Sequence, residues 1–207
     1  AAEHHKLVEL YERSLERVDP ERRIEYLFAI GDLYRGPLED PAQAEYAYKR
    51  VLKERPKHLG AVHALQRTAE AAIRHKQLVE ALDLEATIIS DDKQIVTLLH
   101  RAGEILHEQL GDRNEAVGHF KKVLTLDGHH VPTLASLGRI YHQEGLWADL
   151  IDIYARELHV TSEGPGAVAL LHKMGEVHTR FLADADAAID CFRRALDLDP
   201  RHGPTVH

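Results

Sequence analysis

Apolar residues recur along this chain at the spacing of an α-helix. Between residues 24 and 34 they stand at i, i+3, i+4 and i+7, on one face of a helix: Leu27, Ile30, Gly31 and Tyr34. A second face of this kind runs from Ala44 to Leu52. No segment keeps up the alternation of apolar and polar residues that a half-buried strand requires. The pattern therefore predicts an all-α fold.

The residues between the two predicted helices indicate a turn. Asp40 suits the cap of the second helix, because its carboxylate accepts hydrogen bonds from the free N–H groups at a helix start. Pro41 suits the first helical position, where a missing N–H costs nothing. The pair Arg55-Pro56 then ends the helix. The predicted unit is helix, turn, helix and stop.

The same unit returns every 72 residues. Segments 36–44, 108–116 and 180–188 each end in Ala, with Asp four positions earlier and Leu six positions earlier. Small and aromatic residues recur at the same interval: Gly31, Gly103 and Gly175, and Tyr48, Phe120 and Phe192. A weaker copy lies between these, since segment 78–86 matches segment 150–158. Each period thus holds two units, and the chain is an internal repeat.

We place the units at 24–58, 59–95, 96–130, 131–167 and 168–202. Residues 1–23 match the second helix of a unit that lacks its first helix, and residues 203–207 match the start of a further unit. We therefore expect residues 1–207 to form one solenoid, cut from a longer array. Its uncapped ends would expose Leu7, Leu10 and Tyr11 and favour end-to-end association.

The units resemble the tetratricopeptide repeat family, in a bacterial-type array of alternating 35- and 37-residue repeats. Counted within a unit, that family has small residues at positions 8 and 20, an aromatic residue at 24 and Pro at 32. The first unit supplies these with Gly31, Ala44, Tyr48 and Pro56, and the fifth with Gly175, Ala188, Phe192 and Pro200. The resemblance implies a right-handed α-α superhelix of about five helix pairs, here with an extra N-terminal helix. Small residues let the two helices approach, and the aromatic ring fills the space beside the next pair.

The second and fourth units depart from the family pattern. They carry Leu78 and Leu150 where a small residue is typical, and Glu85 and Glu157 at position 27. The second unit also has Gln66 in place of the glycine at position 8.

In this family the first helices line the concave groove, so the resemblance implies a binding surface at positions 5, 9 and 12. On this chain the candidates are Phe28, Asp32, Arg35, His63, Arg67, Glu70, His100, Glu104, His107, Arg139, His142, His172 and Glu176, with Ala135 and Thr179 completing the positions. Position 9 alternates in sign along the array. One interpretation is a ladder of ion pairs between repeats. The other is a mixed-charge, histidine-rich strip that binds a peptide carrying both charges and that responds to acid as the histidines become charged.

Composition narrows the chemistry. With 34 acidic and 26 basic residues the formal net charge is −8, which argues against nucleic acid as a partner. The single cysteine, Cys191, excludes an internal disulfide or a cysteine-rich zinc site. There is no apolar run of membrane-spanning length and no signal-peptide pattern. We expect a soluble protein without membrane contact, cytoplasmic rather than secreted.

The 16 histidines call for a test of metal binding. His100 and His107 lie two helical turns, roughly 10 Å, apart, too far to share one ion. His130 recurs as His58 and His202, which predicts a loop residue between helix pairs. Cys191 has no local group to activate it, and no nucleophile or phosphate-loop motif is present. We predict no catalytic residues, no metal and no cofactor.

The leading hypothesis is a non-catalytic protein–protein interaction scaffold that binds a peptide or partner helix in its groove. Two alternatives remain. The chain could be a structural spacer or oligomerisation segment of a larger protein, or an RNA-binding helical repeat, which the negative charge disfavours.

Overall fold

The computed structural model describes residues 2–206, without the side chains at 204 and 206. The helices are α1 (Ala2–Ser14), α2 (Pro20–Arg35), α3 (Pro41–Glu54), α4 (Leu59–Ala71), α5 (His75–Ile88), α6 (Asp92–Glu108), α7 (Arg113–Leu126), α8 (Val131–Glu144), α9 (Trp147–Val160), α10 (Pro165–Val177), the π-helical turn η1 (His178–Leu182), α11 (Ala185–Leu198) and α12 (Gly203–Val206). Over the described range no strand occurs. The predicted all-α fold of helix pairs is confirmed.

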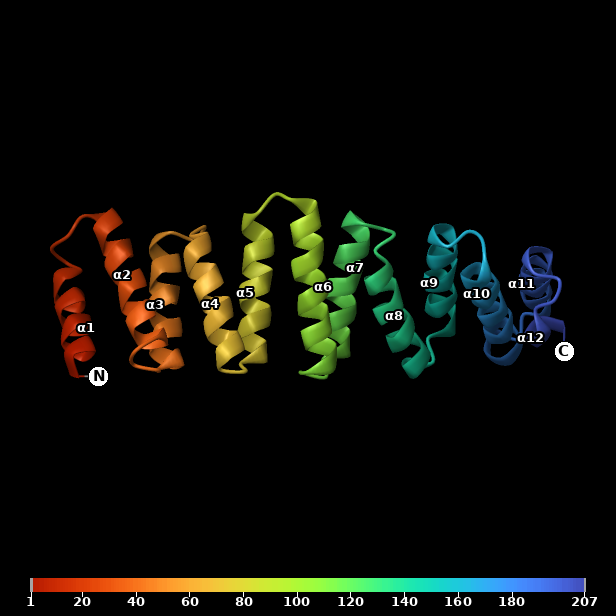
Figure 1. Ribbon diagram of the computed structural model, residues 1–207, viewed down its shortest axis with the longest axis horizontal. Helices are drawn as coiled ribbons and strands as arrows, with labels where there is room; N and C mark the ends of the chain where they lie inside the picture. The colour runs from red at the N-terminus through yellow and green to blue at the C-terminus, as the bar shows by residue number, and fades with distance from the viewer. Residues whose placement is uncertain (1, 207) are drawn as a thin grey trace. The chain divides into compact units, whose positions relative to one another are not determined.

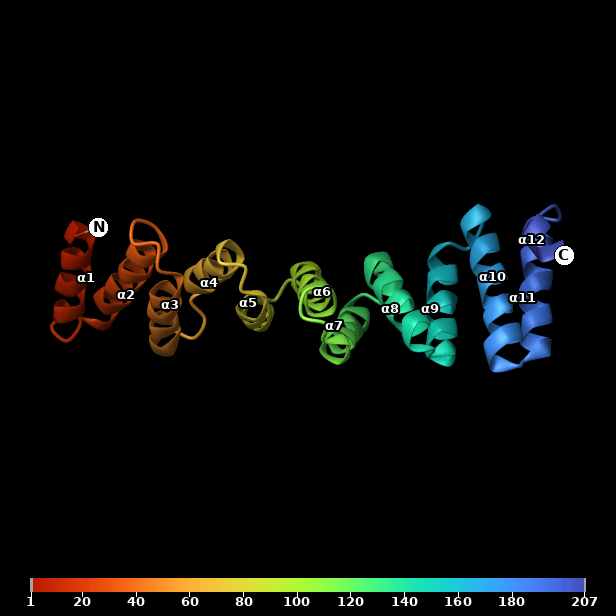
Figure 2. The same cartoon turned by 90° about the horizontal axis from the view of Figure 1, so that it is seen from below.

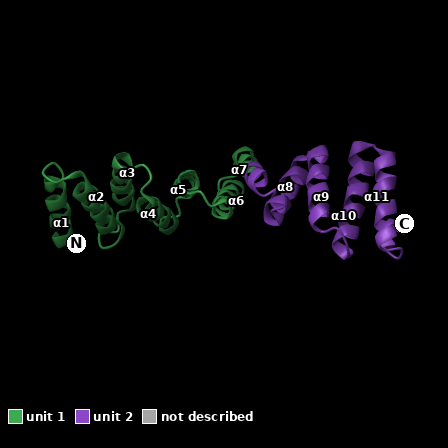
Figure 3. Ribbon diagram, turned by 90° about the horizontal axis from the view of Figure 1, so that it is seen from above, with its two compact units in different colours: residues 1–119 green, residues 120–207 purple. Residues whose placement is uncertain are grey.

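The helices form two compact units, residues 1–119 and 120–207, and the division falls inside α7 (Figure 3). Within each unit a helix packs on the helices next to it in the chain (Figures 1 and 2). In unit 1 these contacts run from α1 through α6, and in unit 2 from α8 through α11. No helix in the described part of the chain is long and apolar enough to cross a membrane.

Aspartates cap several of the helices. The Asp40 carboxylate accepts hydrogen bonds from the backbone N–H groups of Ala42 and Gln43, at 3.1 and 3.0 Å, as the sequence predicts. Its copies one and two periods later, Asp112 and Asp184, each accept one such bond at 3.0 Å. The recurring aspartate is therefore a repeated helix cap.

The first helices of the odd-numbered repeats begin earlier than the predicted boundaries. Their first residues are Pro20, Asp92 and Pro165, three or four residues before positions 24, 96 and 168. Asp19 and Asp91 cap two of them through hydrogen bonds to backbone N–H groups. These caps add a helical turn that the apolar periodicity does not mark.

The recurring histidine lies at the junction between helix pairs, as predicted. His58 caps α4, because its Nδ1 atom accepts a hydrogen bond from the backbone N–H of Ala61 at 3.0 Å. His130 and His202 instead contact the hydroxyls of Thr133 and Thr205, at 2.8 and 2.7 Å. All three histidines thus fix the entry into a first helix.

A glycine of the first helix meets an aromatic ring of the second helix in two pairs. A Cβ atom at Gly31 would lie 2.4 Å from the Tyr48 ring, and one at Gly175 would lie 2.4 Å from the Phe192 ring. No side chain fits at that distance. The ring therefore packs against the glycine of its own pair, and not only beside the next pair as the sequence pattern suggested.

The turn inside each helix pair contains one residue with a left-handed backbone. In α2–α3 and α10–α11 it is Glu39 and Ala183, and in α4–α5 and α8–α9 it is Ile73 and Gly145. Gly145 adopts this conformation without strain, but the β-branched side chain of Ile73 disfavours it. Ile73 is also 73% exposed, so it gains little from burial.

Helix α1 packs on α2 through an aromatic contact. The rings of Tyr11 and Tyr26 lie 4.8 Å apart between centroids. Tyr11 is therefore partly buried, contrary to the expectation that it is exposed. The reason is that α2, the first helix of the next repeat, packs against it. Leu10 is 59% exposed, in agreement with the expectation.

We predict that Ile73→Gly raises the free energy of unfolding by about 1 kcal/mol, because glycine removes the cost of the left-handed backbone. Urea denaturation of the full chain measures the effect. Ala72→Gly is the matched control, since Ala72 has a negative φ of −93° and gains nothing from glycine. Equal effects of the two substitutions would contradict the prediction.

Candidate interaction groove

The predicted groove residues lie on the first helices of their repeats. Those of the first three repeats are on α2, α4 and α6 of unit 1, and those of the last two are on α8 and α10 of unit 2. Thr179 is in the π-helical turn η1. Each of the candidates is at least partly exposed.

In the first repeat the groove residues join the core through Tyr48. The Tyr48 hydroxyl donates a hydrogen bond to the Asp32 carboxylate at 2.7 Å, and Arg35 donates to both groups, at 3.2 and 3.3 Å. Burial and the hydrogen bond to Asp32 raise the pKa of Tyr48 to about 12. Asp32 and Arg35 thus satisfy the polar end of a buried ring.

In the second repeat the Glu85 carboxylate has two hydrogen-bond donors within the chain. Glu85 on α5 accepts hydrogen bonds from the Gln66 amide at 2.6 Å and from the His63 imidazole at 2.8 Å, both on α4. An ionised carboxylate only accepts, so the imidazole nitrogen is the donor. Glu70, one turn further along α4, pairs with Arg101 on α6. The acidic and basic side chains at this junction are therefore mutually satisfied.

The acidic residues at position 9 form ion pairs with residues close by in the sequence. Asp32 pairs with Arg35, Glu104 with His100 at 3.4 Å, and Glu176 with Arg180 at 3.0 Å. These are neighbours three or four residues apart. The ladder between repeats, which was one interpretation of the alternating signs, is not the pairing that these acidic residues adopt.

The groove of unit 2 contains a cavity of about 730 Å³. Residues from α8, α9, α10 and η1 line it. Four residues at the predicted groove positions are among them: Ala135, Arg139, His142 and Glu176. The sequence did not single out the others as groove residues, and they include Tyr154, Glu157, Lys173, Arg180 and Phe181. The structure thus brings together charges of both signs and two aromatic rings.

Glu157 is the half-buried acid of this cavity. Burial raises the pKa of its carboxyl above the ordinary value, and the positive charge of Lys173 counteracts this only in part. Among the described residues, no hydrogen-bond or ion-pair partner is found for the Glu157 carboxylate or for the Lys173 ammonium. Each is therefore able to bind a group from outside the chain.

An aromatic stack forms one rim of the cavity. The rings of Trp147 and Phe181 are stacked at 3.7 Å between centroids, with an interplanar angle of 11°. His142 meets the edge of Trp147 at 5.4 Å. Phe181 is 49% exposed, so the stack offers a flat apolar surface to a ligand.

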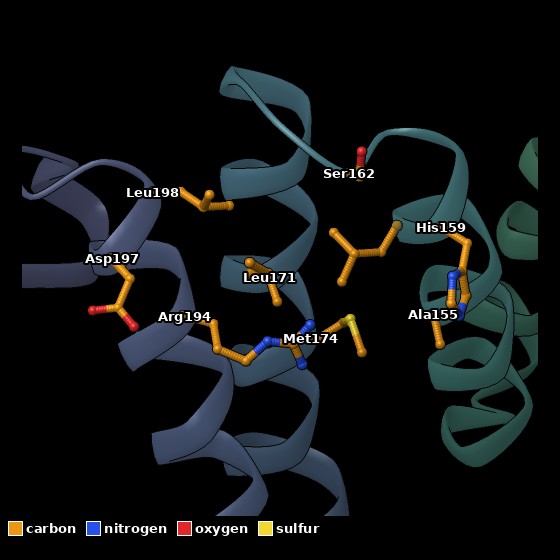
Figure 4. Close-up of a pocket in the computed structure, with 9 residues that line it drawn as sticks. Ala155, His159, Ser162, Leu171, Met174, Arg194, Asp197 and Leu198 are labelled. Carbon is orange, nitrogen blue, oxygen red and sulfur yellow. The ribbon is translucent and has the colours of Figure 1, made fainter.

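A second cavity in unit 2, of about 580 Å³, lies between the second helices α9 and α11 (Figure 4). Figure 4 shows Leu171 and Met174 of α10 between His159 of α9 and Arg194 of α11. One period earlier the equivalent space holds an ion pair, because Asp83 lies 2.8 Å from the His119 ring. Their counterparts in unit 2 are Ala155 and Cys191, which are smaller. Of these two, Ala155 lines the cavity.

The candidate reactive groups are inert or dispersed. Cys191 is buried, and burial raises the pKa of its thiol, which disfavours the nucleophilic thiolate. In the described part of the chain, no group of three His, Cys, Asp or Glu side chains is placed to hold a metal ion.

The cavity residues that sequence reasoning missed had a signal in the repeat itself. At the position of His63 the fourth repeat has Ala135, and at the position of Gln66 it has Gly138. Two large polar side chains are thus replaced by small residues while Glu85 is retained as Glu157. A comparison of the repeats at the 72-residue interval reveals this change. The family pattern does not, because it has a small residue at the position of Gly138.

Comparison with known families gives a match over most of the chain. Models described as tetratricopeptide repeat match residues 25–58, 96–130, 133–167 and 168–202. No curated protein matches the sequence.

Solved structures with similar folds have low sequence identity. The crystal structure of MamA is 20% identical, covers 86% of this chain and 92% of its own, and has a TM-score of 0.48. YrrB, described as a TPR protein with an unusual peptide-binding site, is 14% identical, covers 97% of both chains and has a TM-score of 0.47. A tetratricopeptide repeat protein from Parabacteroides merdae is 15% identical, covers 86% of this chain and 68% of its own, and has a TM-score of 0.47.

We predict that Glu→Gln changes the free energy of unfolding differently at the two equivalent acids. Glu85→Gln is expected to lower the free energy of unfolding at pH 7 by about 1 kcal/mol, because it removes a charge that accepts two hydrogen bonds. Glu157→Gln is expected to be neutral or stabilising at pH 7, because the folded protein disfavours the ionised form.

The pH dependence separates these effects. The raised pKa of Glu157 means that its carboxyl favours folding below the ordinary pKa, and that this contribution is lost as the pH rises through the raised pKa. Glu157→Gln is therefore expected to gain stability relative to the unsubstituted chain between about pH 4 and pH 7. Denaturation curves across that range check this, and a stability difference that does not change with pH would contradict it.

Proposed function

Because the chain belongs to the tetratricopeptide repeat family, we propose that it is a non-catalytic protein–protein interaction scaffold that binds a peptide or partner helix in the concave groove of its first helices. The fold of the family supports interaction with proteins in general. The placement of the ligand in the groove is our specific proposal.

The open cavity beside α8, α9 and α10 is the observation that carries the proposal. Its volume of about 730 Å³ accommodates several side chains of a ligand. The stacked rings of Trp147 and Phe181 offer apolar contact, and Arg139, Lys173 and Glu157 offer charges of both signs. These are the contacts that a peptide uses, since it presents apolar, acidic and amide groups together.

The groove of unit 1 supports the same proposal by contrast. There Glu85 and Glu70 are paired with side chains of the chain itself. A ligand at that junction would have to break these pairs, whereas a ligand in the unit 2 cavity meets Glu157 and Lys173, for which no partner is found among the described residues. We therefore place the main binding site on unit 2.

We predict that Arg139→Ala weakens peptide binding by about tenfold, because it removes a cation from the cavity wall. Peptides selected on the full chain from a phage-displayed random library serve as ligands, and fluorescence anisotropy measures their affinity. Hydrogen exchange then shows whether α8–α10 become protected.

Arg67→Ala is the matched control, because Arg67 holds the equivalent position on α4, one 72-residue period earlier. It is expected to leave the affinity unchanged. Equal losses in both variants, or protection confined to helices outside α8–α10, would count against the proposed site. Salt-dependent binding of single-stranded RNA in place of peptides would favour the RNA-binding alternative.

A further inference from the structure

The two junctions that differ in openness are built on the same pair of charges. Each has an acid on its second helix and a base on the following first helix. In unit 1 these are Glu85 and Arg101, and in unit 2 they are Glu157 and Lys173, at the same interval of 72 residues. The charges are kept, so the difference lies in what surrounds them.

In unit 1, α4 supplies three side chains that satisfy this pair. The His63 imidazole and the Gln66 amide give N–H hydrogen bonds to Glu85, at 2.8 and 2.6 Å. The Glu70 carboxylate pairs with Arg101. Residues 63, 66 and 70 lie on one face of the helix, because they are three and four positions apart. One helix face thus provides two N–H donors and one carboxylate.

In unit 2, α8 provides none of the three. The equivalent residues are Ala135, Gly138 and His142. The first two have no polar side chain, and His142 contacts Trp147 and carries no negative charge for Lys173. The cavity occupies the space between these residues and the two charges. The side chains of His63, Gln66 and Glu70 in unit 1 are therefore examples of the groups that would satisfy Glu157 and Lys173 in unit 2.

We propose that the unit 2 cavity binds an acidic peptide that replaces the missing side chains of α8. An Asn, Gln or His of the peptide donates to Glu157, and an Asp or Glu of the peptide pairs with Lys173. This inference rests on the proposed function, since it names the peptide that the groove would take.

The charges of the cavity favour this peptide over a basic one. Arg139, Lys173 and Arg180 contribute three positive charges, and Glu157 and Glu176 contribute two negative charges. A ligand carboxylate brings the sum to zero, whereas a Lys or Arg side chain would add a fourth cation. A neutral N–H donor beside a carboxylate satisfies Glu157 and Lys173 without that repulsion.

The test transplants the closed junction of unit 1 into unit 2. The double variant Ala135→His/Gly138→Gln restores both donors to Glu157. The site tolerates a side chain at 138, because a Cβ atom there would meet Ile153 and Leu150 only at 3.7 and 3.8 Å. The variant is expected to keep or raise the melting temperature, since Glu157 gains partners.

The probe is a phage-displayed library of random peptides, selected on the full chain. We expect the selected peptides to carry Asn, Gln or His within four positions of Asp or Glu. Their affinity is expected to fall by about tenfold or more in Ala135→His/Gly138→Gln and in Lys173→Ala. Lys53→Ala on α3, a second helix of unit 1, is the control and should leave the affinity unchanged. Lys173→Ala is a second route to the answer, because Lys173 is exposed and contributes little to folding.

The outcomes separate the two proposals. Peptides that protect α8–α10 from hydrogen exchange but bind the double variant as tightly as the unsubstituted chain would overturn this inference and leave the proposed function standing. Selection of basic peptides at that site would do the same. If no peptide protects the groove, both proposals fail.

Discussion

The contact between a glycine and an aromatic ring sets the geometry on which the rest of the molecule depends. At Gly31 and Gly175 a Cβ atom would lie 2.4 Å from the ring of Tyr48 or Phe192, so the two helices of a pair can close only around glycine. This contact orients α2 and α10, each with one face on its partner helix. The residues on the other face are thereby left to line the groove, and Asp32 even satisfies the hydroxyl of the same tyrosine.

The fold was largely predictable because its signals are local and repeated. The helical spacing of apolar residues, the Asp40 cap and the junction histidine that recurs every 72 residues all reappear in the structure. The start of α2 was not predictable from periodicity, because it depends on the capping bond of Asp19 and not on an apolar face. The partial burial of Tyr11 also depends on a neighbouring helix, which a single stripe of residues does not show.

The candidate site was only partly predictable because it is created by missing side chains. Arg139 and Glu176 follow from the resemblance to the family, but Glu157 looks the same in the sequence as Glu85. Whether such an acid is satisfied depends on the side chains 22 and 19 positions earlier, on the first helix of the same repeat. Gly138 fits the family pattern. It nevertheless removes one of the two side-chain donors that the equivalent acid, Glu85, has in unit 1.

Within each unit the helices contact mainly their neighbours along the chain. Folding of such an array proceeds through contacts of short sequence separation, which lowers the entropic cost of closing loops and favours fast folding. The energetic effect of a substitution also remains close to its own repeat. Equivalent repeats can therefore diverge independently. One repeat can keep the side chains that satisfy its charges and so favour stability. Another can carry small residues in their place and leave its charges open to a ligand.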